Sequence, residues 1–136
     1  MFNNIIMVKL QYTIHQHNAK KAGPHFDLRL EKGNEVHSFA LPKNKLPDDK
    51  HVYLAIKTHV DDNKGALDFY GHIPNGIYGA GEIIIYEKGY YNILEWPSDS
   101  SKIIFEVPYQ NGAQKLLGIY YLIKTKENQY IFGKKK

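Results

Sequence analysis

The stretch that decides the fold reads His15-Gln16-His17-Asn18-Ala19-Lys20-Lys21-Ala22-Gly23-Pro24-His25-Phe26-Asp27-Leu28-Arg29-Leu30. Its second half alternates polar with apolar side chains: His25, Asp27 and Arg29 against Phe26, Leu28 and Leu30. Residues two apart on a β-strand project from the same face of the sheet, and successive residues rise by about 3.3 Å. The stretch therefore predicts a strand with an apolar row facing a core and a polar row on its other face.

The rest of the chain repeats this two-residue period in short runs bounded by turn residues. Strands are predicted over residues 8–14, 25–30, 36–41, 53–60, 82–86, 90–96, 102–107, 116–124 and 130–132. Glycine-containing turn signals separate several of these runs, including Lys88-Gly89 between the fifth and the sixth. No run carries a helical stripe longer than two turns. The pattern predicts an all-β protein with little helix, either a sandwich or a small closed barrel of about eight strands.

The length of 136 residues is that of one domain. We expect a single domain over residues 1–136, with residues 1–10 as an N-terminal extension or first strand and residues 133–136 as a basic tail. The sequence has no cysteine, which excludes disulfides and thiolate metal sites and fits a cytoplasmic protein. The first ten residues have no basic leader and no long apolar span, so neither a signal peptide nor a membrane helix is expected.

The chain is basic, with 18 Lys and Arg residues against 14 Asp and Glu residues and a formal charge of +4. A basic surface favours anionic partners such as nucleic acid. Lysine-rich surfaces are also common in proteins that bind no nucleic acid, so the charge alone favours a nucleic-acid partner without establishing one.

A metal site is the chemistry that the polar row favours. His25 and Asp27 lie roughly 6–7 Å apart along a strand, within reach of one ion. Residues 18–24 are long enough for a hairpin that returns His17 across from them. Two imidazoles and a carboxylate suit Mn²⁺, Zn²⁺ or Fe²⁺ and leave coordination positions for water and substrate. The alternative is an exposed strand face tied by cross-strand ion pairs.

Phosphate is the ligand that the neighbouring residues favour. Arg29, one step along the same face, offers a planar fork that matches two phosphate oxygens. Lys43 could add an ammonium group, although a solvated lysine is the simpler interpretation. The glycine-rich run 71–81 is expected to form turns, and Tyr78 within it is expected in the core instead of on a base-stacking platform.

Four motifs in order resemble the 3′-phosphoesterase family, a module fused to bacterial DNA ligase D and also found alone in archaea and bacteria. His17 with His25-Phe26-Asp27-Leu28-Arg29-Leu30-Glu31 resembles its H…H-[YF]-D-x-R-L-E signature. The other three are Ser38-Phe39-Ala40-Leu41-Pro42-Lys43, the run from Phe69 to Glu82, and the closing run from Leu117 to Lys124.

The resemblance implies a compact β-barrel and a Mn²⁺-dependent DNA-repair enzyme. Such an enzyme trims a 3′-terminal ribonucleoside and removes the remaining 3′-phosphate, which leaves a 3′-OH. It implies DNA or DNA/RNA 3′ ends as partners, with a ligase and a polymerase in the same end-joining pathway. By motif position, His17, His25 and Asp27 correspond to metal ligands, and Arg29 and Lys43 to phosphate contacts.

One region departs from the family, which usually reads V-E-D-H-P-L-x-Y with an active-site histidine. This chain reads Val60-Asp61-Asp62-Asn63-Lys64-Gly65-Ala66-Leu67. Asn63 falls near the histidine position and is retained as a phosphate contact. His72 or His59 is expected to supply the missing imidazole, and His72 is favoured because it lies in the run most like the family's.

Two other functions remain open at this stage. A barrel that binds nucleic-acid ends without catalysis is favoured by the altered region around Asn63. A metal hydrolase of a small phosphoester is permitted by the modest net charge.

Overall fold

The computed structural model describes residues 9–136, so the predicted strand residue Val8 and most of the predicted extension 1–10 lie outside the described part. Its strands are β1 (Leu10–Ala19), β2 (Gly23–Lys32), β3 (Glu35–Leu41), β4 (Tyr53–Asp61), β5 (Gly71–Ile73), β6 (Gly81–Glu95), β7 (Lys102–Val107), β8 (Gly118–Lys126) and β9 (Gln129–Lys134). The one helix of the described residues is a short 3₁₀ turn, η1 (Lys64–Leu67).

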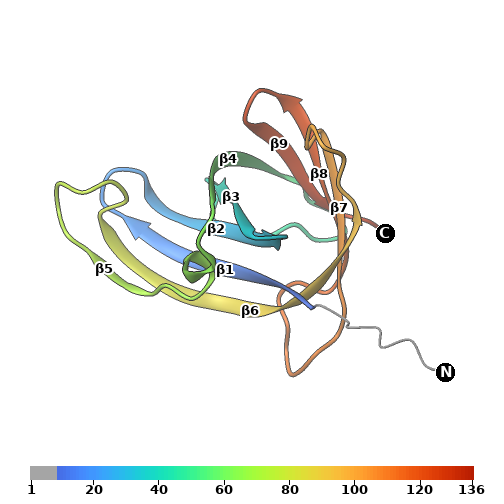
Figure 1. Ribbon diagram of the computed structural model, residues 1–136, viewed down its shortest axis with the longest axis horizontal. Coiled ribbons are helices and arrows are strands. Elements are labelled where there is room, and N and C mark those ends of the chain that lie inside the picture. The colour runs from blue at the N-terminus through green and yellow to red at the C-terminus, as the bar shows by residue number, and fades with distance from the viewer. Residues whose placement is uncertain (1–8) are drawn as a thin grey trace.

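The strands form a closed antiparallel barrel, which confirms the all-β prediction and decides for the barrel over the sandwich (Figure 1). Eight strands follow the order β1-β2-β3-β4-β9-β8-β7-β6, and β6 pairs with β1 to close the ring. The short β5 pairs with the first residues of β6, on the edge that faces away from β1. No helix of the described residues is both long enough and apolar enough to cross a membrane.

The apolar rows of the strands fill the barrel interior. Leu28 and Leu30 of β2 are fully buried, as is Ile14 of β1, which lies directly opposite Leu28. Aromatic rings such as Phe39, which meets the Tyr130 ring edge-on, complete this core. The predicted sidedness of the strand over residues 25–30 is therefore confirmed.

The predicted break at Lys88-Gly89 is wrong, because β6 runs without interruption from Gly81 to Glu95. Gly89 lies directly opposite Tyr12 in the β1–β6 pair. A side chain there would begin 3.0 Å from the Tyr12 ring and 2.7 Å from Oε1 of Gln110. Gly89 thus permits a close approach of ring and strand and forms no turn.

Most other strand ends agree with the predictions to within a few residues, which is the usual ambiguity at the ends of regular elements. β1 continues past the predicted end at Ile14 to Ala19. β9 extends to Lys134, so the predicted basic tail 133–136 begins inside this strand. Neither η1 nor β5 was predicted, because each is too short to display a period.

The outer face of β1 and β2 is covered by residues 62–80, which we call the covering segment. It leaves β4, passes through η1 and β5, and enters β6 (Figure 1). Backbone carbonyls of this segment accept hydrogen bonds from β1: Thr13 Oγ1 donates to Leu67 (2.8 Å) and His15 Nε2 to Phe69 (2.7 Å). Thr13 and His15, two outward polar side chains of β1, are therefore buried between the barrel wall and this segment.

Candidate metal centre and phosphate groove

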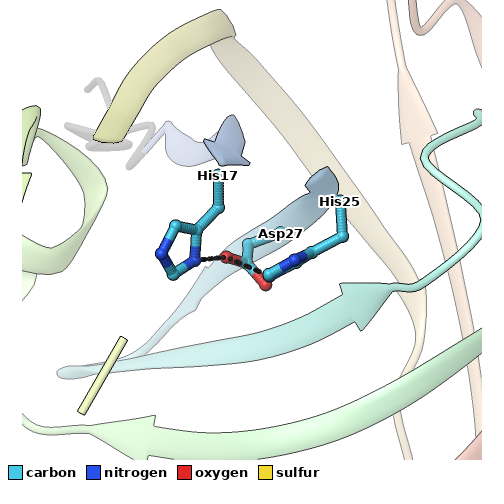
Figure 2. A group of neighbouring side chains, drawn as sticks. All are labelled: His17, His25 and Asp27. Atoms are coloured by element: carbon cyan, nitrogen blue, oxygen red, sulfur yellow. Dashed lines mark ion pairs between the residues drawn. The ribbon is translucent and has the colours of Figure 1, made fainter. Parts of the chain in front are cut away.

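Three side chains predicted as metal ligands meet at the β1–β2 hairpin (Figure 2). His17 lies directly opposite His25 in this antiparallel pair, and Asp27 follows two residues later on the same face. His17 Nδ1 and His25 Nε2 each lie 3.4 Å from Oδ2 of Asp27. One ligand atom from each of the three residues falls within 4.8 Å of the others. The group can hold a metal ion.

Hydrogen bonds to backbone carbonyls fix which nitrogen of each ring faces inward. His17 Nε2 lies 2.7 Å from the Gly79 carbonyl oxygen, and His25 Nδ1 lies 3.0 Å from that of Gly23. A carbonyl can only accept, so these outer nitrogens carry the protons and the inner nitrogens present lone pairs. Two lone pairs and a carboxylate thus converge, and such a set requires a cation between its members. The donor set fits a divalent metal, with the outer hydrogen bonds orienting the rings.

The pKa values of Asp27 and His25 reflect the same demand for positive charge. Burial alone would raise the pKa of Asp27, but its pairing with His25 and the nearby charge of Arg29 outweigh burial and lower it. The Asp27 carboxylate in turn raises the pKa of His25, more than burial lowers it. A proton and a metal ion therefore compete for His25 Nε2.

Arg29 lies beside the triad and is held on three sides. Its Nε donates to Nδ1 of His15 (2.9 Å) and its Nη1 to Oγ of Ser38 (2.7 Å). Its Nη2 lies 3.7 Å from Oδ2 of Asp27. The guanidinium is thus fixed at one position next to the candidate metal ligands, which is the geometry needed to clamp a phosphate there.

No role was predicted for His15 from the sequence. The ring is fully buried and bridges the Phe69 carbonyl to the Arg29 guanidinium. Burial, and secondarily the charge of Arg29, lower the pKa of His15 to about 4. His15 is therefore neutral and accepts from Arg29. The sequence signal that could have identified His15 is its two-residue spacing from His17, which places both side chains on the same face of the strand.

A groove of about 970 Å³ opens above these residues. The triad and Arg29 line one part of it, and His59 and Asp61 of β4 line another. Strand β3 lies between these two parts and contributes Ala40 to the lining. The small side chain of Ala40 leaves space on the groove floor.

The other sequence candidates lie apart from the triad. His72 pairs through Nδ1 with Oε1 of Glu82 and, like Asn63, is not among the described residues that line the groove. Asn63 Oδ1 accepts from the Gly65 amide at 2.7 Å and caps η1. Lys43 is exposed in the turn after β3, next to Pro42, which does line the groove. His59, the less favoured histidine, lines the groove with its Nε2 3.4 Å from Oδ2 of Asp61.

Tyr78 is not in the core, contrary to expectation, because its side chain is 87% exposed. The Ala80 amide donates to the Ile77 carbonyl oxygen at 3.0 Å, which closes a four-residue turn. Gly79 has a φ of 80°, as the third residue of a type II turn requires. Tyr78 occupies the corner before it and is among the residues that line the groove.

The model of the family described as "DNA Ligase D 3'-phosphoesterase domain" matches residues 15–124. The chain belongs to this family. The resemblance drawn from its motifs is thereby confirmed.

Several curated relatives of this 3′-phosphoesterase family member carry the name "Multifunctional non-homologous end joining protein LigD". The protein of Mycobacterium bovis is 36% identical over 88% of this chain, and that of Mycolicibacterium smegmatis 34% identical over 93%. The protein of Pseudomonas aeruginosa is 31% identical over 93%. The aligned region amounts to only 15%, 17% and 15% of these relatives' respective lengths.

Loss of one ligand should abolish metal binding. In calorimetric titrations with Mn²⁺, His25→Ala and Asp27→Ala should bind no metal, whereas His72→Ala, which removes a histidine away from the triad, should bind like the wild type. Wild-type affinity should fall as the pH is lowered, because imidazole binds metal only when neutral, and the raised pKa of His25 starts this fall above the ordinary histidine range. Unchanged affinity in both ligand variants would refute the assignment.

The neutrality of His15 should make folding stability depend on pH. In the unfolded chain an ordinary histidine pKa of about 6.5 applies. The folded value is about 4, so between these values the unfolded state binds the extra proton and stability falls as the pH falls. From pH 7 to pH 5 this linkage should cost about 2 kcal/mol. Urea titrations of His15→Gln, which keeps an acceptor and a donor but cannot titrate, should show a drop smaller by that amount; equal drops would contradict the assignment.

Proposed function

We propose that this chain is a divalent-metal-dependent phosphoesterase that removes the 3′-phosphate from a nucleic-acid end and leaves a 3′-OH. The observation that carries the proposal is that Arg29, which can bind a phosphate, contacts the group of residues that can hold a metal, and that both line one groove. Arg29 Nη2 lies 3.7 Å from Oδ2 of Asp27, the carboxylate shared by the metal triad. Membership of the 3′-phosphoesterase family supports the same reaction.

His17, His25 and Asp27 would hold the metal, and Mn²⁺ is the proposed ion, with Zn²⁺ or another divalent metal as alternatives. When bound, the metal supplies a Lewis acid and an activated water nucleophile. Arg29 binds the phosphate. Of its five N–H groups, one is used by His15, one by Ser38 and one faces Asp27. One N–H on each terminal nitrogen remains for two oxygens of the phosphate.

His59 is the residue that we propose as the proton donor, in place of His72. Arg29 lies opposite Ser38 on β3, and Ser38 lies opposite His59 on β4. With adjacent strands about 4.8 Å apart, the backbones of Arg29 and His59 are about 10 Å from one another. A phosphate held by Arg29 would thus lie between the metal ligands and His59.

The proton from His59 would go to the 3′ oxygen as its bond to phosphorus breaks, while water supplies the oxygen of the released phosphate. Asp61 Oδ2, 3.4 Å from His59 Nε2, would orient the imidazole for the transfer. A histidine can donate a proton near neutral pH, whereas the Asn63 amide cannot.

The natural substrate that we propose is a DNA or DNA/RNA 3′ end, with Lys43 as an additional phosphate contact. The relatives are named as non-homologous end joining proteins. We therefore propose that the chain acts beside a DNA ligase and a polymerase in that pathway, and that removal of a 3′-ribonucleoside is a second activity of the same site.

A duplex that ends in a 3′-phosphate tests the function. Metal-free protein should be inactive, and addition of Mn²⁺, Zn²⁺ or Mg²⁺ in turn should restore conversion to a 3′-OH with at least one of them. Arg29→Lys should lose most of this turnover while keeping metal affinity, because an ammonium group cannot reproduce the planar fork.

Two results would replace this proposal with one of the two alternative functions. Tight binding of the duplex without turnover under any metal would make the chain a barrel that binds nucleic-acid ends. Hydrolysis of a small phosphoester, combined with duplex binding that shows no salt dependence, would make it a small-molecule hydrolase.

Replacement of the proposed proton donor gives a second measurement. His59→Ala should lower turnover of the 3′-phosphate by about 10²-fold, the scale of general acid help. His72→Ala is the matched control, since this histidine also pairs with a carboxylate but lies outside the groove lining, and it should retain wild-type turnover. The reverse pattern would transfer the role to His72.

A further inference from the structure

Tyr78 is an exposed aromatic ring on a turn that is held from two sides. The turn is closed by the hydrogen bond from the Ala80 amide to the Ile77 carbonyl oxygen (3.0 Å). The Ala80 carbonyl oxygen in turn accepts from the Lys20 amide at 2.9 Å, which ties the turn to the β1–β2 hairpin. A ring that is 87% exposed on such a fixed turn offers a flat surface at little entropic cost of ordering.

The turn adjoins the metal centre directly. The carbonyl oxygen that accepts from His17 Nε2 at 2.7 Å belongs to Gly79, the residue after Tyr78. A group stacked on the Tyr78 ring would therefore lie beside the phosphate bound at the triad. Figure 2 shows the three ligands toward which such a phosphate would point.

Two cationic side chains border the same end of the groove. Lys20 and Lys21 form the exposed tip of the β1–β2 hairpin and line the groove together with Tyr78. Within residues 9–136, neither lysine takes part in an ion pair. Their ammonium groups are thus available to an anion outside the metal site.

We propose that Tyr78, Lys20 and Lys21 form a subsite for the terminal nucleotide of a nucleic-acid strand. The Tyr78 ring stacks on the nucleobase of the nucleotide that carries the 3′-phosphate, and the lysines contact the next phosphate of the backbone. Alternating aromatic and cationic groups are how proteins bind strands without reading their sequence. The inference rests on the proposed function and deepens it, because it makes a nucleobase next to the phosphate part of what the site recognises.

The outer face of a terminal base is free at the end of a strand, whether or not the base is paired. The subsite therefore requires no strand separation. It favours nucleic-acid ends over small phosphoesters, which have a phosphate for Arg29 but no base for Tyr78.

Binding without turnover separates this subsite from catalysis. Fluorescence anisotropy with no added metal would compare two labelled 3′-phosphate oligonucleotides, one with a normal terminal nucleotide and one with an abasic terminal residue. The wild type should bind the abasic strand about 5- to 150-fold more weakly, the usual effect of losing one stacked base. Tyr78→Ala should bind the normal strand with this weakened affinity and no longer distinguish the two strands.

Tyr78→Trp should keep the discrimination, because it keeps an aromatic face. Tyr109→Ala is the matched control: Tyr109 is also an exposed tyrosine, at 66%, but is not among the described residues that line the groove. This control should bind both strands as the wild type does. Discrimination that survives in Tyr78→Ala, or its absence in the wild type, would overturn the role of Tyr78.

The lysines are tested by the salt dependence of the same binding. Lys20→Gln and Lys21→Gln should each reduce the slope of log affinity against log salt by about one, and should leave the preference for the normal strand unchanged. Lys126→Gln, an exposed lysine at the end of β8, should leave the slope unchanged. Slopes unaltered by both hairpin variants would remove the lysines from the subsite.

The outcomes for the subsite and for the proposed function are distinguishable. Discrimination between the two strands in a protein that hydrolyses no 3′-phosphate with any metal would retain the subsite and refute the phosphoesterase. Turnover of a 3′-phosphate without any dependence of binding on the terminal base would retain the enzyme and refute the subsite.

Discussion

The antiparallel register of β1 and β2 is the constraint on which the site depends. It sets His17 opposite His25 and His15 opposite Asp27, all on the outer face, while Ile14 and Leu28 face inward as another opposite pair. A shift of one residue in either strand would exchange these faces, because the side-chain period of a strand is two. The apolar core of the barrel therefore stabilises the alignment of the candidate metal ligands, because a shift that separated the histidines would also expose the leucines.

The covering segment supplies hydrogen-bond partners for the polar side chains that this register places on the outer face of β1. Burial of a polar row is costly unless each group finds a partner. Three successive outward side chains of β1, Thr13, His15 and His17, each contact a backbone carbonyl of the segment, at Leu67, Phe69 and Gly79. Backbone carbonyls accept and never donate, so the segment dictates the protonated nitrogen of both rings. The contact at Phe69 leaves a lone pair of His15 facing Arg29, and the contact at Gly79 leaves a lone pair of His17 facing the candidate metal position.

The parts of the site that could be predicted from the sequence lie within one hairpin. His25, Asp27 and Arg29 follow from a local two-residue period, and a short turn returns His17 beside them. The positions of Ser38 and His59 depend on how β3 and β4 are registered, including an irregularity between Ser38 and Phe39 that no local pattern reveals. The predictions for Gly89 and Tyr78 were wrong for a related reason. A glycine can form a turn or permit a close approach of another residue, and a tyrosine can lie in the core or on the surface. Residues distant in the sequence determine which of these occurs.

The three carbonyl contacts of the covering segment also bear on the order in which the site is assembled. They join residues 54, 54 and 62 positions apart, whereas the ligands His17 and Asp27 lie within a single hairpin. Local contacts form early in folding and distant ones late, since a long loop must first be closed. The hairpin brings the three side chains together first, with the His25 ring already oriented by the Gly23 carbonyl, and the His17 ring acquires its fixed orientation only when the segment docks. The site is therefore complete only after the covering segment has closed over the hairpin.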